Sequence, residues 1–149
     1  MKVIAKNPRS RFDYALEDTL LAGIVLTGPE VKSVRGGKVN LKGSYVKLNT
    51  DSAEVINMHI APYPFAVNQP HEETRTRKLL LTQKQLDDLN ARKNQGRHVV
   101  PTALGVQGKF IKLEIGIGTS KKRRDKRETI KQRQSSRESA RIIKNKTVG

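Results

Sequence analysis

The C-terminal segment constrains the fold more than any other feature, because its composition prevents it from forming a core of its own. Residues 119–149 contain twelve basic and three acidic residues, and their apolar side chains are Ile130, Ala140, Ile142, Ile143 and Val148. Such a segment cannot bury enough surface to offset the conformational entropy lost on ordering. We therefore expect a folded body over residues 1–118 and a basic tail over residues 119–149 that is disordered when free.

Charge indicates the kind of partner. The chain has 30 Lys and Arg against 14 Asp and Glu, a formal net charge of +16 in 149 residues, and such a field attracts polyanions. Within the tail, KKRRDKR (residues 121–127) places six cations in seven positions. This density is more typical of nucleic-acid binding than of a solvated tail. We therefore predict an RNA or DNA partner.

Other classes of protein are excluded or disfavoured. The chain has no Cys, which excludes disulfide scaffolds, thiolate zinc sites and cysteine nucleophiles. No apolar run is long enough for a transmembrane helix or a signal peptide, so we expect a cytoplasmic protein without a membrane partner. The three histidines are too dispersed for a metal motif, and no nucleophile–base constellation is visible. We therefore expect no metal, no cofactor and no enzymatic activity.

The body reads mainly as short antiparallel strands. Residues 12–26 predict a long strand, bent or bulged near Gly23, and residues 1–11 predict a flexible arm. Residues 44–49 and 53–60 predict a hairpin, with Ile56, Met58 and Ile60 on one face. Residues 99–106 and 110–117 predict a last hairpin, whose second strand alternates apolar and polar residues.

Two short helices interrupt these strands. Thr27 and Glu30 have the spacing of a capping box, and Thr82 and Gln85 repeat it. We therefore predict a mainly β fold with peripheral helices, an antiparallel OB-like barrel, because closure removes exposed strand edges. The aromatic residues are expected mostly in the core of this barrel: Phe12, Tyr14, Tyr45, Tyr63, Phe65 and Phe110.

Several blocks of sequence together resemble the SsrA-binding protein (SmpB) family. They are GPEVKSVR (28–35), NLKGSY (40–45), RTRKLLL (75–81), KK (121–122), DKRE (125–128) and ARIIKN (140–145). They match in order and spacing over nearly the whole chain. By composition alone, the block at 75–81 fits a core strand with a charged edge as well as it fits an RNA-binding surface.

The resemblance implies a function in trans-translation. Members of the family bind the tRNA-like domain of transfer-messenger RNA (tmRNA, also called SsrA) and deliver it to stalled ribosomes. The nascent chain is then tagged for degradation and the ribosome is rescued. The tail of the family occupies the small-subunit decoding centre and the empty mRNA channel, where it folds into a helix. A tRNA-delivering elongation GTPase takes part indirectly, and we expect a monomer.

The resemblance and the charge pattern together give the expected contact residues. In the body, tmRNA contacts are expected at Asn7, Arg9, Arg11, Tyr14, Lys32, Arg35, Arg75, Arg77, Lys78, Leu80 and Lys112. In the tail, ribosome contacts are expected at Lys121, Lys122, Arg123, Arg124, Asp125, Lys126, Arg127, Lys131 and Arg133.

Two positions depart from the family. Many members have Glu where this chain has Leu21, and many have His or Tyr where it has Arg124. The RNA contact of that Glu cannot be transferred to Leu21, whereas the planar guanidinium of Arg124 could still stack on a ribosomal base. Three alternatives stay open on sequence alone: a general RNA chaperone or ribosomal structural protein, a membrane-surface protein that uses its polybasic tail, and, more distantly, an enzyme.

Overall fold

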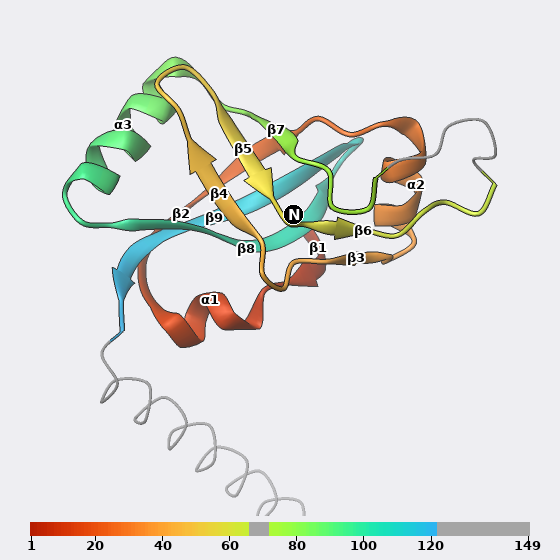
Figure 1. The fold of residues 1–149 in the computed structure, drawn as a ribbon, viewed down its shortest axis with the longest axis horizontal. Helices are drawn as coiled ribbons and strands as arrows, with labels where there is room; N and C mark the ends of the chain where they lie inside the picture. Colours follow the sequence, from red (N-terminus) through yellow and green to blue (C-terminus); the bar gives the residue numbers. More distant parts are fainter. Residues whose placement is uncertain (66–71, 122–149) are drawn as a thin grey trace, which may run out of the picture.

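The structure is a computed structural model, and it describes residues 1–65 and 72–121. Within these residues an antiparallel sheet carries helices at its margins (Figure 1). The strands are β1 (Lys2–Lys6), β2 (Tyr14–Ile24), β3 (Val39–Asn40), β4 (Tyr45–Leu48), β5 (Ala53–Ile56), β6 (His59–Ile60), β7 (Arg77–Leu80), β8 (His98–Gln107) and β9 (Phe110–Ser120). The helices are α1 (Pro8–Asp13), α2 (Gly28–Arg35) and α3 (Gln83–Asn94).

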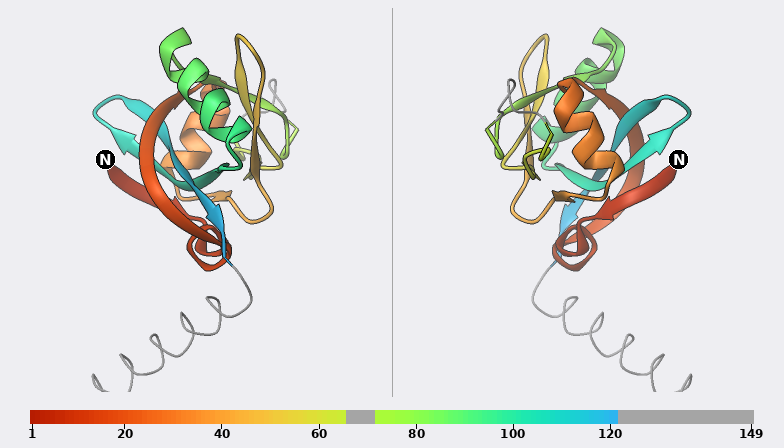
Figure 2. Two further views of the ribbon diagram at one scale, coloured as in Figure 1. Left: turned by 90° about the vertical axis from the view of Figure 1, so that its left-hand side faces the viewer. Right: turned by 90° about the vertical axis from the view of Figure 1, so that its right-hand side faces the viewer.

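The main sheet is curled rather than flat. In the described residues its strands follow the order β1-β8-β9-β2-β7-β5-β4, while β3 and β6 form a separate pair. Strand β4, at one edge, lies against β8, and Figure 2 shows β2 curving around the sheet. The predicted mainly β fold, an antiparallel and partly closed barrel with peripheral helices, is confirmed. No helix within residues 1–65 or 72–121 is long and apolar enough to cross a membrane.

Both predicted helix starts are confirmed. At α2, Thr27 Oγ1 accepts the Glu30 N–H and Glu30 Oε1 accepts the Thr27 N–H, at 3.4 and 2.9 Å. Thr82 and Gln85 make the same reciprocal pair at α3, at 3.1 and 2.9 Å. Each capping box satisfies two backbone donors that have no partner inside the helix, and this fixes where the helix begins.

The long strand and the last hairpin are also confirmed, with one correction to the position of the bulge. Strand β2 is regular at Gly23, and its register shifts instead between Leu16 and Asp18. Strand β9 buries Ile111, Leu113, Ile115 and Ile117 as the alternation predicted. It continues past the predicted end of the strand to Ser120, whose partner in β2 is Tyr14.

The prediction of a flexible N-terminal arm is wrong. Residues 2–6 form β1, which pairs with β8, and residues 8–13 form α1. Asn7 lies between them and is buried, with its N–H bonded to Thr102 O at 2.8 Å and its Nδ2 to Pro101 O at 2.9 Å. Pairing with a distant strand therefore orders residues 2–6, and Ile4 and Ala5 of this strand also pack against the core.

The strand predicted over residues 53–60 is interrupted. Asn57 has φ 62° and ends β5, and the next residues leave for β6, which pairs with β3. The buried face changes phase at this point: Val55, Met58 and Ile60 are buried, whereas Ile56 is only partly buried. Asparagine tolerates the left-handed region better than most residues with a Cβ.

The core is aliphatic, and the prediction that the aromatic residues fill it is wrong. Its largest buried hydrophobic residues are Leu, Ile, Met and Val. Phe12, Tyr14 and Tyr63 are partly buried, while Tyr45, Phe65 and Phe110 are exposed. Strand alternation explains why Phe110 is exposed. Its side chain points to the same outward side of β9 as Lys112, whereas Ile111 points inward. The exposed rings are thus available to partners.

Candidate nucleic-acid interface

An apolar row with a lysine at its end crosses the outward surface of three neighbouring strands. Gly23 in β2 pairs with Leu80 in β7 on one side and with Lys112 in β9 on the other. Leu80 is 56 % exposed, although it is a large apolar side chain. A Cβ on Gly23 would lie 3.2 Å from the Leu80 Cβ, so glycine keeps the middle of the row open. A hollow of about 340 Å³ lies here, lined also by Phe110.

Two more apolar side chains extend this row. Phe110, two residues before Lys112 in β9, is 69 % exposed, and the Lys112 Nζ lies 5.7 Å from the centre of its ring. Leu21, two residues before Gly23, is exposed as well. Its cross-strand neighbour is Glu114. We call Leu21, Gly23, Leu80, Phe110 and Lys112 the platform.

Three lysines around the platform, Lys78, Lys109 and Lys112, form no ion pair within the described residues. Near α3, by contrast, surface arginines are paired: Arg92 with Asp18 and Asp88, and Arg97 with Glu17. The platform side therefore presents apolar and aromatic surface beside lysines that form no ion pair, a combination that suits bases and phosphates of RNA.

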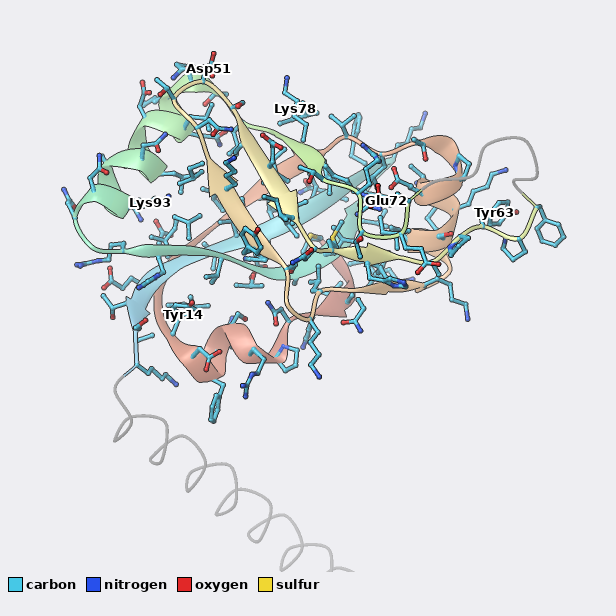
Figure 3. The ribbon with its side chains drawn as sticks, in the orientation of Figure 1. Tyr14, Asp51, Tyr63, Glu72, Lys78 and Lys93 are labelled. Atoms are coloured by element: carbon cyan, nitrogen blue, oxygen red, sulfur yellow. The ribbon has the colours of Figure 1, made fainter. Side chains whose placement is uncertain are left out.

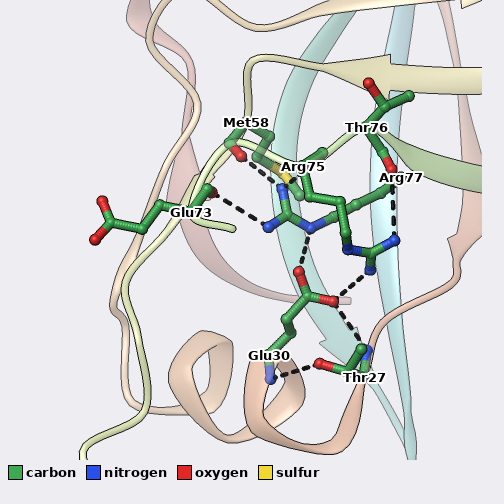
Figure 4. A network of polar contacts seen from close by, with 7 residues as sticks. All are labelled: Thr27, Glu30, Met58, Glu73, Arg75, Thr76 and Arg77. Atoms are coloured by element: carbon green, nitrogen blue, oxygen red, sulfur yellow. Dashed lines mark hydrogen bonds and ion pairs between the residues drawn. The ribbon is translucent and has the colours of Figure 1, made fainter. Parts of the chain in front are cut away.

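Arg77, expected to contact RNA, is fully buried, and this prediction is wrong. Its Nε lies 2.6 Å from Glu30 Oε2, and its Nη1 and Nη2 donate to the carbonyls of Met58 and Glu73 at 2.6 and 3.2 Å (Figure 4). Arg75 bonds Glu30 Oε1 and is only partly exposed. The block at 75–81 therefore contains a core strand in which Arg77 is buried in an ion pair, while Lys78 and Leu80 lie on the outward surface.

Opposing effects set the charge state of this buried pair. Burial alone would raise the pKa of Glu30, but hydrogen bonds from Arg75, the Thr27 N–H and Arg77 lower it to about 2, from an ordinary value of 4.5. The pKa of Arg77 is lowered by burial, and Glu30 offsets part of that effect. The carboxylate is thus charged at neutral pH and joins α2 to the segment before β7.

This pair gives a pH dependence of stability. Because the pKa of Glu30 is lower in the folded chain than in the unfolded one, its contribution is complete above about pH 5 and is lost as pH falls towards 2. We expect the free energy of unfolding in urea to fall more steeply over this range in the native chain than in Glu30→Gln. Parallel pH profiles for the two chains would contradict this assignment.

The N-terminal group of expected contacts lies apart from the platform, at the other end of β2. Arg9 and Arg11 are exposed on α1, and the Tyr14 ring lies 5.1 Å from the ring of His98. A groove of about 350 Å³ runs between α1 and the segment before β4, and its lining includes Arg9, Tyr14, Lys42 and Tyr45. The buried Asn7 holds the backbone here rather than presenting its amide to solvent.

The remaining expected residues are on α2 or in the tail. Lys32 and Arg35 are exposed on α2, and Arg35 Nη2 donates to Lys109 O at 3.4 Å, beside the platform. Lys121 donates its N–H to Asp13 O at 2.9 Å. The other tail residues, 122–149, lie outside the described residues. In the part of the chain that is described, no group of three or more His, Asp or Glu side chains could hold a metal ion.

Sequence reasoning identified Lys78, Leu80 and Lys112 but missed Phe110. The signal was available, since the alternation that buries Ile111 and Leu113 also turns Phe110 outward with Lys112. Alternation within one strand does not predict which strands pair, so the pairing of β7, β2 and β9 could not be predicted from the sequence. It is this pairing that brings Gly23, Leu80 and Lys112 into one row.

Comparison with known proteins gives a consistent result at the level of sequence. Residues 4–145 match the family model described as SmpB protein. The SsrA-binding protein of Shouchella clausii is 43% identical over 149 residues, which cover 99% of this chain and 96% of that protein. The SsrA-binding protein of Oceanobacillus iheyensis is 44% identical over 145 residues, with 96% and 94% of the two chains covered.

A solved structure is similar to this chain in both fold and sequence. A chain in the structure described as "tmRNA-SmpB: a journey to the center of the bacterial ribosome" superposes with a TM-score of 0.66 and 34% sequence identity. The match covers 85% of this chain and 93% of the other. Sequence and fold therefore point to the same group of proteins.

Proposed function

This chain belongs to the SmpB family of SsrA-binding proteins, and we propose that it binds tmRNA through the platform and delivers it to stalled ribosomes. The observation that carries the proposal is the Leu80–Gly23–Lys112 row, with Phe110 and unpaired lysines around it. Here exposed apolar side chains lie beside lysines that, within the described residues, form no ion pair.

The platform has the chemistry to recognise folded RNA. Exposed Leu and Phe side chains supply apolar contact to bases that leave the stack, and Lys112 and Lys78 supply phosphate contacts. The body, which extends to the end of β9, thus acts as the RNA carrier, and its buried Glu30–Arg77 pair joins α2 to the start of β7. In this role the chain is an RNA-binding protein.

The tail beyond Ser120, the last residue of β9, has a separate role in the proposal. It enters the decoding centre and the mRNA channel of the small subunit when the channel is empty, and it becomes helical there. The channel cannot easily hold both the cationic tail and an mRNA, so the tail enters only when mRNA is absent. The tail ribosome contacts are those expected above, from Lys121 to Arg133.

A competition experiment tests the role of the body. We expect the full chain to retain tmRNA in the presence of excess bulk tRNA at fixed physiological salt. Replacing Lys112 by Ala should weaken tmRNA binding about fivefold to tenfold and lower the salt slope by about 1, because one phosphate contact is lost. The measurement is a binding titration at several salt concentrations.

A matched lysine provides the control. Lys84 is exposed on α3 and, within the described residues, forms no ion pair. Lys84→Ala removes the same charge and should change tmRNA affinity less than about twofold. Equal losses in the two variants, or equal displacement of tmRNA by tRNA, would instead indicate a general RNA-binding protein held by charge alone.

A further inference from the structure

A second aromatic site lies beyond α2, in the segment Pro62-Tyr63-Pro64-Phe65 that follows β6 (Figure 3). Two backbone hydrogen bonds anchor its start, from the Ala61 N–H to Lys38 O and from the Ile60 N–H to Glu73 O, each 2.9 Å. The prolines fix φ on both sides of Tyr63. The segment is therefore stiff, although it has no regular secondary structure.

The two rings of this segment contact each other and a lysine. Tyr63 and Phe65 meet edge to face with centroids 5.4 Å apart, and the Lys32 Nζ lies 5.2 Å from the centre of the Tyr63 ring. Phe65 is nevertheless 80 % exposed. A ring left in water contributes little to folding, and it gains free energy only when a partner covers it. We call Lys32, Tyr63 and Phe65 the aromatic tip.

A line of cations connects the aromatic tip to the platform. Lys32 and Arg35 lie one turn apart on α2, and Arg35 donates to the carbonyl of Lys109, in the turn that leads to Phe110 and Lys112. In residues 1–65 and 72–121, none of these four cations forms an ion pair. Positive charge thus follows one edge of the molecule from the platform to the tip.

The same arrangement occurs at both ends of this edge. At the platform a lysine amine lies near the ring of Phe110, and at the tip another lies near the ring of Tyr63. Stacking rings joined by a cationic groove are the means by which proteins follow an RNA strand. A protein partner is disfavoured, because the apolar surface of the tip is limited to two rings with uncompensated cations beside them.

We propose that the aromatic tip stacks on an unpaired base of the RNA that lies on the platform, while Lys32, Arg35 and Lys109 contact its phosphates. The proposal rests on the proposed function only for the identity of that RNA. Phe65, the more exposed ring, provides the stacking face, and Tyr63 supports it through the edge contact. The tip would give a second point of attachment and so fix the orientation of the bound RNA.

A tryptophan reporter tests this directly, because the chain contains no Trp. Phe65→Trp in the full chain provides one fluorophore at the tip. Saturating tmRNA is expected to quench its emission and to reduce its accessibility to acrylamide. Phe65→Leu keeps the apolar character without the aromatic face and should bind tmRNA about fivefold to tenfold more weakly.

A second reporter provides the control. Val3→Trp places a Trp at another exposed position, 42 % exposed in β1, and its emission should not change on RNA binding. An unquenched, acrylamide-accessible Trp at position 65 in a complex that forms normally overturns the inference and leaves the proposed function intact. That result would assign the aromatic tip to a protein partner instead of RNA. A quenched Trp at position 65 with no preference for tmRNA over tRNA supports the stacking site and contradicts the proposed function instead.

Discussion

Ending the chain after Lys121 is expected to abolish tagging of stalled nascent chains, while selectivity for tmRNA over tRNA is unchanged and affinity stays within about threefold at physiological salt. Residues 122–149 carry eleven of the chain's basic residues and three of its acidic ones. The proposed function assigns them to the ribosome and assigns tmRNA binding to the platform, which lies entirely in the body. Tagging in a reconstituted translation system and a tmRNA titration give the two readouts.

The position of the truncation matters. Thr119 and Ser120 belong to β9 and pair with Ala15 and Tyr14, and the Lys121 N–H bonds Asp13 O. Ending the chain at residue 118 would therefore remove part of β9. A loss of tagging could then come from a damaged body as well as from the missing tail. A full-length chain with Asp125, Lys126 and Arg127 replaced by Ala retains most of the tail charge and should also fail to tag. Loss of tmRNA selectivity on truncation at 121 would contradict the division of roles.

Replacing Glu30 by Gln should lower the free energy of unfolding by about 3–5 kcal/mol, because Arg77 is then left charged and buried without a counter-charge. This is a large share of the 5–15 kcal/mol typical of a small domain. Denaturant unfolding followed by circular dichroism measures it. The loss also loosens the connection between α2 and the segment before β7.

The matched control is a pair at the surface. Glu17 lies 3.0 Å from Arg97, a separation similar to that of the buried pair, but both side chains are well exposed. Glu17→Gln should cost less than about 1 kcal/mol, because solvent screens exposed pairs. Similar costs for the two substitutions would show that burial of the Glu30–Arg77 pair has no energetic consequence.

Local signals in the sequence predicted local structure well. The capping boxes at Thr27 and Thr82 and the alternation along β9 each depend on residues a few positions apart, and each is confirmed. Their physical basis is short-range: a side-chain oxygen reaches a backbone N–H three residues away, and strand side chains alternate with a period of two.

Features that depend on distant partners were missed. Strand β1 is ordered by pairing with the distant strand β8, and Arg77 is buried because Glu30, 47 residues earlier, can neutralise it. Neither segment carries a local mark of its partner. The aromatic residues were misplaced for a related reason: their hydrophobicity predicts burial, but the aliphatic side chains already fill this small core.

The pairing of β1 with β8 has a consequence for how the protein is made. Lys2 faces Val106 in the sheet, so the first strand synthesised lacks its hydrogen-bonding partner until most of the body has been translated. Contacts of such long range slow folding. At roughly 5–20 residues per second, β1 waits on the order of 5–20 s. A copy cut short before β8 leaves β1 without its hydrogen-bonding partner.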